Sequence, residues 1–323
     1  MEPWVDAATP AAAAAKFWLS RAKLYPSATR TAASDALWAA DVFRKLGDRE
    51  RLFDALTNAA SQFAYAGDFA AAENALAEAK SLLEPQWPGW TMVAFALVSS
   101  GVKYWSGDTA EARRRLRAAL DLSRGDGDAS QTEWIEMMLV GCDVASRNSC
   151  DVLHASAAML DRDSPPMGGF NRAVVESFRG AALVQMGELE NAGALFQAAF
   201  PRIRRALGTA HTTLCHFAFL LARRGRYADA ARLLGAVEAL HPAGAAILAP
   251  PNRASYDEAA VIVEEALDAA ELARLMAEGS MLSEDEAVAV MFADNMVLGG
   301  RAPDPSRERS HNPHNIPSHR HQA

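Results

Sequence analysis

The sequence has few cysteines and no long apolar run. Its three cysteines form no CxxC pair and no even-numbered framework, which argues against a disulfide scaffold and suits a reducing compartment. No stretch of eighteen or more strongly apolar residues occurs, and the alanine run 11–15 is too short for a membrane span or an export signal. We therefore expect a cytoplasmic protein with no membrane partner.

Basic charge is also in deficit, with 32 Lys and Arg against 40 Asp and Glu and a net charge of −8. Nucleic-acid affinity rests largely on neutralising phosphates, so no direct nucleic-acid binding is expected from this segment. Two local basic groups stand out: Arg113, Arg114, Arg115 and Arg117, and Arg202, Arg204, Arg205, Arg223, Arg224 and Arg226. We interpret them as solvated faces whose stems cover apolar neighbours, with an anion or acidic-partner site as the alternative.

Signatures of catalysis and metal binding are missing as well. The chain contains no GxxxxGK[ST] phosphate loop, no GxSxG elbow and no HExxH zinc motif. His211 and Cys215 lie four residues apart beside His216, but no third ligand follows at a known spacing, so we expect them to pack or face solvent. The tail histidines 311, 314, 319 and 321 are expected to be solvated, and the acidic runs 264–265 and 284–286 to lie on exposed faces and at a helix start. The sequence thus predicts no enzyme, no metal and no cofactor.

A recurring turn is the strongest positive signal. It appears as Gly67-Asp68-Phe69, Gly107-Asp108-Thr109, Gly187-Glu188-Leu189 and Gly225-Arg226-Tyr227, with spacings of 40, 80 and 38 residues. A degenerate turn, Arg147-Asn148-Ser149, divides the double interval, so the period is close to forty residues. That length suits two antiparallel helices per unit, because glycine can end one helix in the left-handed conformation and the acidic residue can cap the next.

Small residues recur at fixed offsets from these turns. Seven residues before the turn glycine stand Ala60, Ser100, Gly180 and Ala218, and five after it stand Ala72, Ala112, Ala192 and Ala230. The following helix continues with apolar residues at the same spacing: Leu76 and Ala79, Leu116 and Ala119, Phe196 and Ala199, Leu234 and Val237. This pattern predicts an all-α fold, a right-handed α-solenoid of tetratricopeptide-like helix pairs, although the usual repeat has about 34 residues.

We expect helical repeats over 1–241, a short helical cap over 242–296 and a disordered tail over 297–323. The predicted helices span 10–24, 31–46, 49–66, 69–83, 90–106, 109–123, 130–146, 150–161, 170–186, 189–206, 210–224, 227–240, 254–267, 269–278 and 284–296. Residues 1–9 are expected to be poorly ordered and Pro250-Pro251 to lie in a loop. Ser283 and Glu286 predict a capping box, and Gly279 is expected to close the helix before it.

Several segments resemble a known family. They are Lys16-Phe17-Trp18-Leu19, residues 43–52, Glu84-Pro85-Gln86-Trp87-Pro88, Ala230-Ala231-Arg232-Leu233-Leu234-Gly235, residues 270–279 and residues 282–287. Together they are similar to the C-terminal tetratricopeptide-like helical-repeat region of large bacterial ATP-dependent transcriptional regulators of the signal-transduction ATPase class. The resemblance extends from about Ala11 to Ala293. In such regulators a winged-helix DNA-binding domain and an ATPase domain lie upstream; neither is present in this chain, which leaves a fragment, a split gene product and a free-standing relative as alternatives.

The resemblance implies a non-catalytic repeat module, the sensory or regulatory part of a transcriptional regulator, which binds a protein, a peptide or a small effector. The alternative is an oligomerisation or docking scaffold for a separate ATPase and DNA-binding chain, and the oligomeric state stays open. Polar or aromatic positions on the first helix of each unit are the candidate groove contacts: Tyr65, Tyr104, Trp105 and Arg179.

Overall fold

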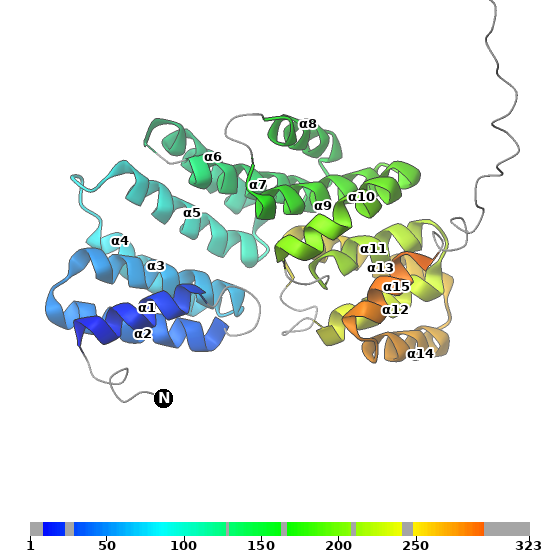
Figure 1. Ribbon diagram of the computed structural model, residues 1–323, viewed down its shortest axis with the longest axis horizontal. Coiled ribbons are helices and arrows are strands. Elements are labelled where there is room, and N and C mark those ends of the chain that lie inside the picture. Colours follow the sequence, from blue (N-terminus) through cyan, green and yellow to red (C-terminus); the bar gives the residue numbers. More distant parts are fainter. Residues whose placement is uncertain are drawn as a thin grey trace, which may run out of the picture. The chain divides into compact units, whose positions relative to one another are not determined.

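The computed structural model describes residues 9–22, 29–126, 129–162, 167–207, 211–240 and 248–293 (Figure 1). Within these residues the protein is all-α, with fifteen helices and no strand. Consecutive helices pack in pairs, which confirms the predicted solenoid-like helical fold. One compact unit, which ends at Met291, contains all of them.

Each predicted helix is present. The chain begins with α1 (Pro10–Ala22) and α2 (Thr29–Leu46). Five pairs follow: α3 (Arg49–Tyr65) with α4 (Phe69–Leu82), α5 (Gly89–Trp105) with α6 (Thr109–Asp126), α7 (Ala129–Ala145) with α8 (Ser149–Leu160), α9 (Gly169–Gln185) with α10 (Leu189–Leu207), and α11 (His211–Arg223) with α12 (Tyr227–Leu240). The last helices are α13 (Pro250–Ala266), α14 (Ala269–Ser280) and α15 (Glu284–Met291).

The turns within the pairs have the predicted geometry. Each turn glycine has a positive φ, for example 77° at Gly67 and 84° at Gly187. After α3 the Gly67 N–H donates to the Ala64 carbonyl at 3.1 Å and the Asp68 N–H to the Phe63 carbonyl at 2.9 Å, so the last carbonyls of the helix are satisfied. The Asp68 side chain then accepts the Ala71 N–H at 3.1 Å and caps α4.

The degenerate turn keeps this geometry without glycine. Arg147 has a φ of 58° and donates its N–H to the Val144 carbonyl at 3.1 Å, while the Asn148 N–H donates to the Asp143 carbonyl at 2.9 Å. A side chain in this left-handed region costs roughly 1–2 kcal/mol per residue. The turn at Arg147 therefore lies where the forty-residue period predicts it. Unlike the other turns it has no glycine, and the backbone strain at Arg147 is the energetic cost.

Packing between paired helices follows the predicted small-residue positions. All the second-helix positions named above are buried, from Ala72, which has no exposed surface, to Leu76 at 4%. Gly180 is small because a Cβ there would lie 2.5 Å from Cζ of Phe196. The other units place Ala or Ser opposite Leu at the same offsets: Ala60 and Leu76, Ser100 and Leu116, Ala218 and Leu234. The unit with the larger side chain on its second helix, Phe196, thus has the smaller residue, Gly180, on its first helix.

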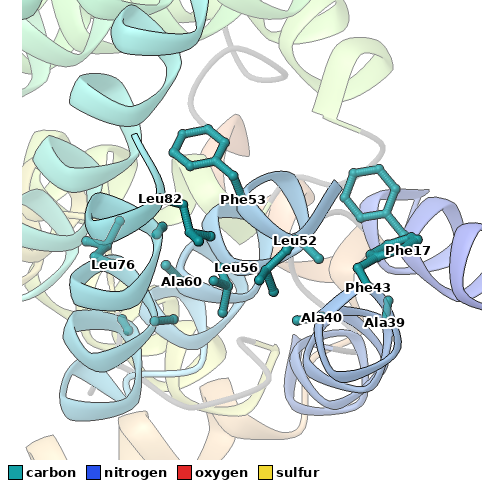
Figure 2. Close-up of a cluster of buried hydrophobic side chains, with 14 of the residues drawn as sticks. Phe17, Ala39, Ala40, Phe43, Leu52, Phe53, Leu56, Ala60, Leu76 and Leu82 are labelled. Atoms are coloured by element: carbon teal, nitrogen blue, oxygen red, sulfur yellow. The ribbon is translucent and has the colours of Figure 1, made fainter. Parts of the chain in front are cut away.

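The core runs along the chain and is not concentrated at one point. One buried cluster joins α1 to α5 and includes Phe17, Phe43, Phe53 and Leu76 (Figure 2). A second joins α5 to α9. Trp105 packs against both clusters, so neighbouring units share apolar surface, as expected when each unit buries its flank on the next.

Two predictions about the C-terminal helices are wrong. Pro250 and Pro251 do not form a loop but open α13, because the first N–H groups of a helix need no intrahelical acceptor and proline already has a helical φ. Gly279 does not end α14, which continues to Ser280. Its role is close helix contact, since a Cβ there would lie 2.7 Å from the carbonyl carbon of Arg232, and Gly235 on α12 approaches Met276 equally closely.

The predicted capping box is confirmed at the start of α15. The Ser283 N–H donates to Oε2 of Glu286 at 2.8 Å, and the Glu286 N–H donates to Oγ of Ser283 at 3.3 Å. The expectations for residues 1–8 and for the tail 297–323 lie outside the described residues. Within the described part of the chain, no helix has both the length and the apolar character that crossing a membrane requires.

Candidate interaction surface on the first helices

The first helices of successive units lie next to one another. α3 packs against α5, α5 against α7, α7 against α9, and α9 against α11. We call the side of these five helices that is turned away from the second helices the first-helix face. Stacked repeats present such faces as extended binding surfaces, so this face is the candidate site.

Two of the four predicted contact residues join neighbouring first helices. The rings of Tyr65 on α3 and Trp105 on α5 meet edge to face, with centroids 5.1 Å apart. Both side chains are half-buried. Burial also raises the pKa of the Tyr65 hydroxyl.

Tyr104 and Arg179 lie elsewhere. Tyr104 is only 4% exposed, and its hydroxyl fills the space beside Gly141 on α7, where a Cβ would lie 2.5 Å from it. Arg179 extends from α9 towards α8, with Nη1 3.3 Å from Oγ of Ser156 and 3.4 Å from the Leu153 carbonyl. Tyr104 thus packs inside the core and Arg179 links two helices, so among the predicted aromatic contacts only Tyr65 and Trp105 keep partly exposed side chains.

Sequence reasoning missed the role of α13. This helix packs against the first helices α7 and α11 and against α12. Three polar contacts hold it: Nδ1 of His216 lies 2.8 Å from Oγ of Ser255, Nε of Arg147 donates to Glu258 at 2.7 Å, and the Tyr256 hydroxyl donates to Glu238 at 2.5 Å. The C-terminal part of the first-helix face is therefore covered by the chain itself.

The surroundings of His216 keep its ring neutral. The side chain is buried between α11 and α13, and desolvation lowers its pKa to about 4, with a hydrogen bond to Asn252 acting in the opposite direction. The rings of Phe178 and Phe196 lie 6.4 and 6.5 Å from its centre. Burial raises the pKa of the neighbouring Cys215 thiol to about 12, so this cysteine serves as a small apolar residue and not as a thiolate.

Two buried positions on α11 have half-exposed counterparts on α5. Cys215 and His216 lie ten and nine residues before the turn glycine Gly225, and the same offsets from Gly107 fall on Leu97 and Val98. On α11 these positions are buried, whereas on α5 they are half-exposed. We call Ala94, Leu97, Val98 and Gly101, which are all half-exposed, the apolar α5 strip.

The strip has no charge to keep it hydrated. Residues 89–102 of α5 contain no Asp, Glu, Lys or Arg, although most of them are not fully buried. A helix that is apolar on all sides is normally enclosed by other elements. Leu97 and Val98 also pack against the two buried clusters. The α5 strip is therefore partly covered apolar surface, and Leu97 and Val98 hold the register of positions that are buried on α11, three units further along the chain.

Most arginines of the two basic groups form ion pairs within the chain: Arg113, Arg114, Arg115, Arg202, Arg204, Arg224 and Arg226. Arg113 pairs with Asp143 at 2.7 Å, and Arg202 pairs with the buried Glu176 at 2.8 Å. Hydrogen bonds from Arg114 and then Arg115 lower the pKa of Glu111 to about 2. These guanidinium groups are thus neutralised locally, which fits the interpretation as a structural face better than an anion site.

An open pocket of about 540 Å³ marks the place where α13 passes the ends of α7 and α11. Its lining combines two arginines, two carboxylates and two aliphatic side chains: Arg147, Arg223, Asp257, Glu258, Val261 and Ile262. The Arg223 guanidinium lies over the Phe219 ring at 5.9 Å. Opposite charges are balanced here, so the pocket offers no strong preference for an anion or a cation.

No group of three or more His, Cys, Asp or Glu that could hold a metal ion occurs among the described residues. Comparison with known proteins finds no matching family model and no matching curated protein. The surface must therefore be interpreted from its own chemistry, which is an apolar strip at one end of the face and an internal helix at the other.

Proposed function

We propose that this chain is a non-catalytic interaction module that binds a protein or peptide partner on the first-helix face. It acts in the cytoplasm as the sensory or regulatory part of a bacterial transcriptional regulator, and the resemblance of residues 11–293 to such repeat regions supports this assignment. A small effector on the same face is the other ligand class that the resemblance implies.

The observation that carries the binding proposal is the apolar α5 strip. Leu97 and Val98 occupy the register positions of the buried Cys215 and His216 on α11, and all four strip residues are half-exposed on the helix that also carries Trp105. Exposed apolar surface next to aromatic side chains is typical of interaction sites. The chemistry of the strip fits the apolar face of an amphipathic helix.

An arginine placed in the strip tests the proposal. Ala94→Arg puts a charge at a half-exposed alanine of α5, and Ala70→Arg puts the same charge at an exposed alanine of α4. The partner is isolated from an extract of the source cells with the wild-type chain, and its dissociation constant is then measured for each variant. We expect Ala94→Arg to weaken binding at least tenfold, about 1.4 kcal/mol, and Ala70→Arg to leave it unchanged.

Equal loss in both variants, or no loss in either, would contradict a site on α5. Circular dichroism during thermal unfolding shows whether each variant keeps the wild-type fold.

A second candidate function, an oligomerisation or docking scaffold, is favoured by α1. Trp18 is 62% exposed and Leu19 50% exposed, and the Arg21 guanidinium lies 5.6 Å from the Trp18 ring. Two adjacent exposed apolar side chains on one helix fit an interface with a second chain. If α1 self-associates, light scattering gives a dimer or larger species that Trp18→Glu converts to a monomer; a monomeric wild type at all concentrations rules out self-association.

A further inference from the structure

The helix on the C-terminal part of the first-helix face has an unusual inner surface. The buried residues of α13 are Pro250, Pro251, Asn252, Ser255, Tyr256, Ala259 and Val263. Only Asn252 and Ser255 in this set are polar, and its aliphatic members are small or medium-sized, whereas the second helices bury larger apolar side chains such as Leu116 and Phe196. The α13 contact therefore combines modest apolar packing with hydrogen bonds at Ser255 and Tyr256, and water can replace those hydrogen bonds when the helix leaves.

The Arg147–Glu258 pair links α13 to the solenoid across 111 residues of sequence. Arg147 holds the left-handed position that glycine holds in the turns of the other units. The Arg147 side chain is 65% exposed, while the Glu258 side chain is 19% exposed. This turn thus carries a side chain in a strained conformation, and that side chain contacts α13.

The helix that follows α13 has an anchorage of its own. α14 packs on α12 through the reciprocal glycines Gly235 and Gly279, where the two backbones nearly touch. α15 packs on α11 and α12. Detachment of α13 therefore leaves both later helices held by contacts that α13 does not make.

We propose that the surface of α7 and α11 under α13 is a helix-binding site, which α13 occupies as an internal ligand and for which a partner helix competes. The competing helix places small residues over Cys215, a hydroxyl or amide group beside His216 and a carboxylate beside Arg147. A partner that must first displace α13 binds more weakly than one that meets an uncovered surface, so α13 would regulate partner binding. This regulatory role rests on the proposed function.

The test uses the full chain and a fluorescent peptide with the sequence of residues 250–267. Ala259 has no exposed surface, so Ala259→Arg detaches α13 and vacates the site. Ala266 is exposed at the end of the same helix and lies outside the pocket lining, so Ala266→Arg adds the same charge without detaching it. We expect the Ala259→Arg chain to bind the peptide at least tenfold more tightly than the wild type and Ala266→Arg chains do.

A charge exchange provides a second variant that keeps the core intact. Glu258→Arg loosens α13 but retains Arg147, so this chain also gains affinity for the wild-type peptide. The Arg147→Glu chain prefers a peptide that carries Glu258→Arg over the wild-type peptide. This reversal of preference identifies the Arg147 contact as part of the site.

The proposal is overturned if neither the Ala259→Arg nor the Glu258→Arg chain binds the peptide more tightly than the wild type. Should Ala259→Arg unfold, as judged by loss of helical circular dichroism, the Glu258→Arg chain alone decides. The outcome is independent of Ala94→Arg, since the peptide reports on α7 and α11 while the partner reports on α5. The two proposals can therefore fail separately.

Discussion

Gly180 and Phe196 offer a direct test of how paired helices pack in this chain. A Cβ on Gly180 would lie 2.5 Å from Cζ of Phe196, about 1 Å closer than the normal separation of roughly 3.5–4.0 Å between carbon atoms. Gly180→Ala must therefore push the α10 ring or the α9 backbone aside. Gly101, a helical glycine on α5, has no such neighbour, because its nearest contact would be Cε of Met138 at 3.9 Å.

The magnitudes separate the two alanine variants. Replacing a helical glycine by alanine gains about 1 kcal/mol of helix stability, and overpacking costs about 1–3 kcal/mol. Gly101→Ala is therefore expected to stabilise the chain by up to about 1 kcal/mol, and Gly180→Ala to be roughly 2 kcal/mol worse than this control. Adding Phe196→Leu to Gly180→Ala recreates the alanine–leucine combination of Ala60 with Leu76 and recovers about 1–2 kcal/mol as a coupling energy.

Urea unfolding followed by circular dichroism measures these differences as shifts in the transition midpoint. The wild type, Gly101→Ala, Gly180→Ala, Phe196→Leu and the double variant complete the cycle. The reasoning is refuted if Gly180→Ala stabilises the chain as much as Gly101→Ala does, or if the two substitutions at 180 and 196 are additive.

Three further predictions concern the C-terminal helices. Gly279→Val forces α12 and α14 apart at their closest point and should lower stability by about 1–3 kcal/mol, detected as a lower thermal midpoint. The control Gly125→Val, at a helical glycine with open space, should change stability by less than about 0.5 kcal/mol. Burial lowers the pKa of His216 from 6.5 to about 4, so the folded chain resists protonation of this ring. The contribution of the neutral ring to the free energy of unfolding, about 3 kcal/mol, is fully present above pH 6.5 and is lost as the pH falls to about 4. His216→Gln should flatten the dependence of unfolding free energy on pH in that window; an unchanged slope would mean that another group titrates there. Ser283→Ala removes the capping oxygen of α15 and should cost about 0.5–2 kcal/mol, with faster amide exchange at the start of that helix as the specific sign.

The sequence predicted those parts of the fold that local chemistry determines. Four of the turns within the helix pairs have a glycine with a positive φ, which an acidic residue follows at Gly67, Gly107 and Gly187, and the turn at Arg147 was located by the period alone. The buried stripe of the second helices was predictable because alanine and large apolar residues alternate at helical spacing, as in Ala112, Leu116 and Ala119.

The position of α13 could not be predicted in the same way. Its inner stripe mixes the polar Asn252 and Ser255 with Tyr256, Ala259 and Val263. Because Val261 is apolar yet 53% exposed, hydrophobic periodicity does not identify the side that faces the core. Its key contact joins Arg147 to Glu258, a pair far apart in the sequence. The one indication in the sequence was an arginine at the position of the turn glycine. It suggests that the Arg147 side chain makes a contact, but it does not identify Glu258 as the residue contacted.

The candidate contact residues show a similar limit. Tyr104 and Trp105 are adjacent aromatic residues, yet one is buried against Gly141 and the other half-exposed beside Tyr65. Consecutive helical residues point about 100° apart, and only the neighbouring helix decides which of them meets solvent. Gly279 illustrates the same ambiguity, since a glycine near a helix end suits both a cap and a close crossing.

Amide hydrogen exchange of the intact wild-type chain tests the central claim, that α13 is a removable occupant of the first-helix face. The account predicts that amides of α13 exchange through a local opening, faster than those of α11 and α12 beneath it and independently of urea at low concentration. α14 should remain protected together with α12. If α13 exchanges only when α11 and α12 do, with the same dependence on urea, it is a fixed part of the core and the account is contradicted.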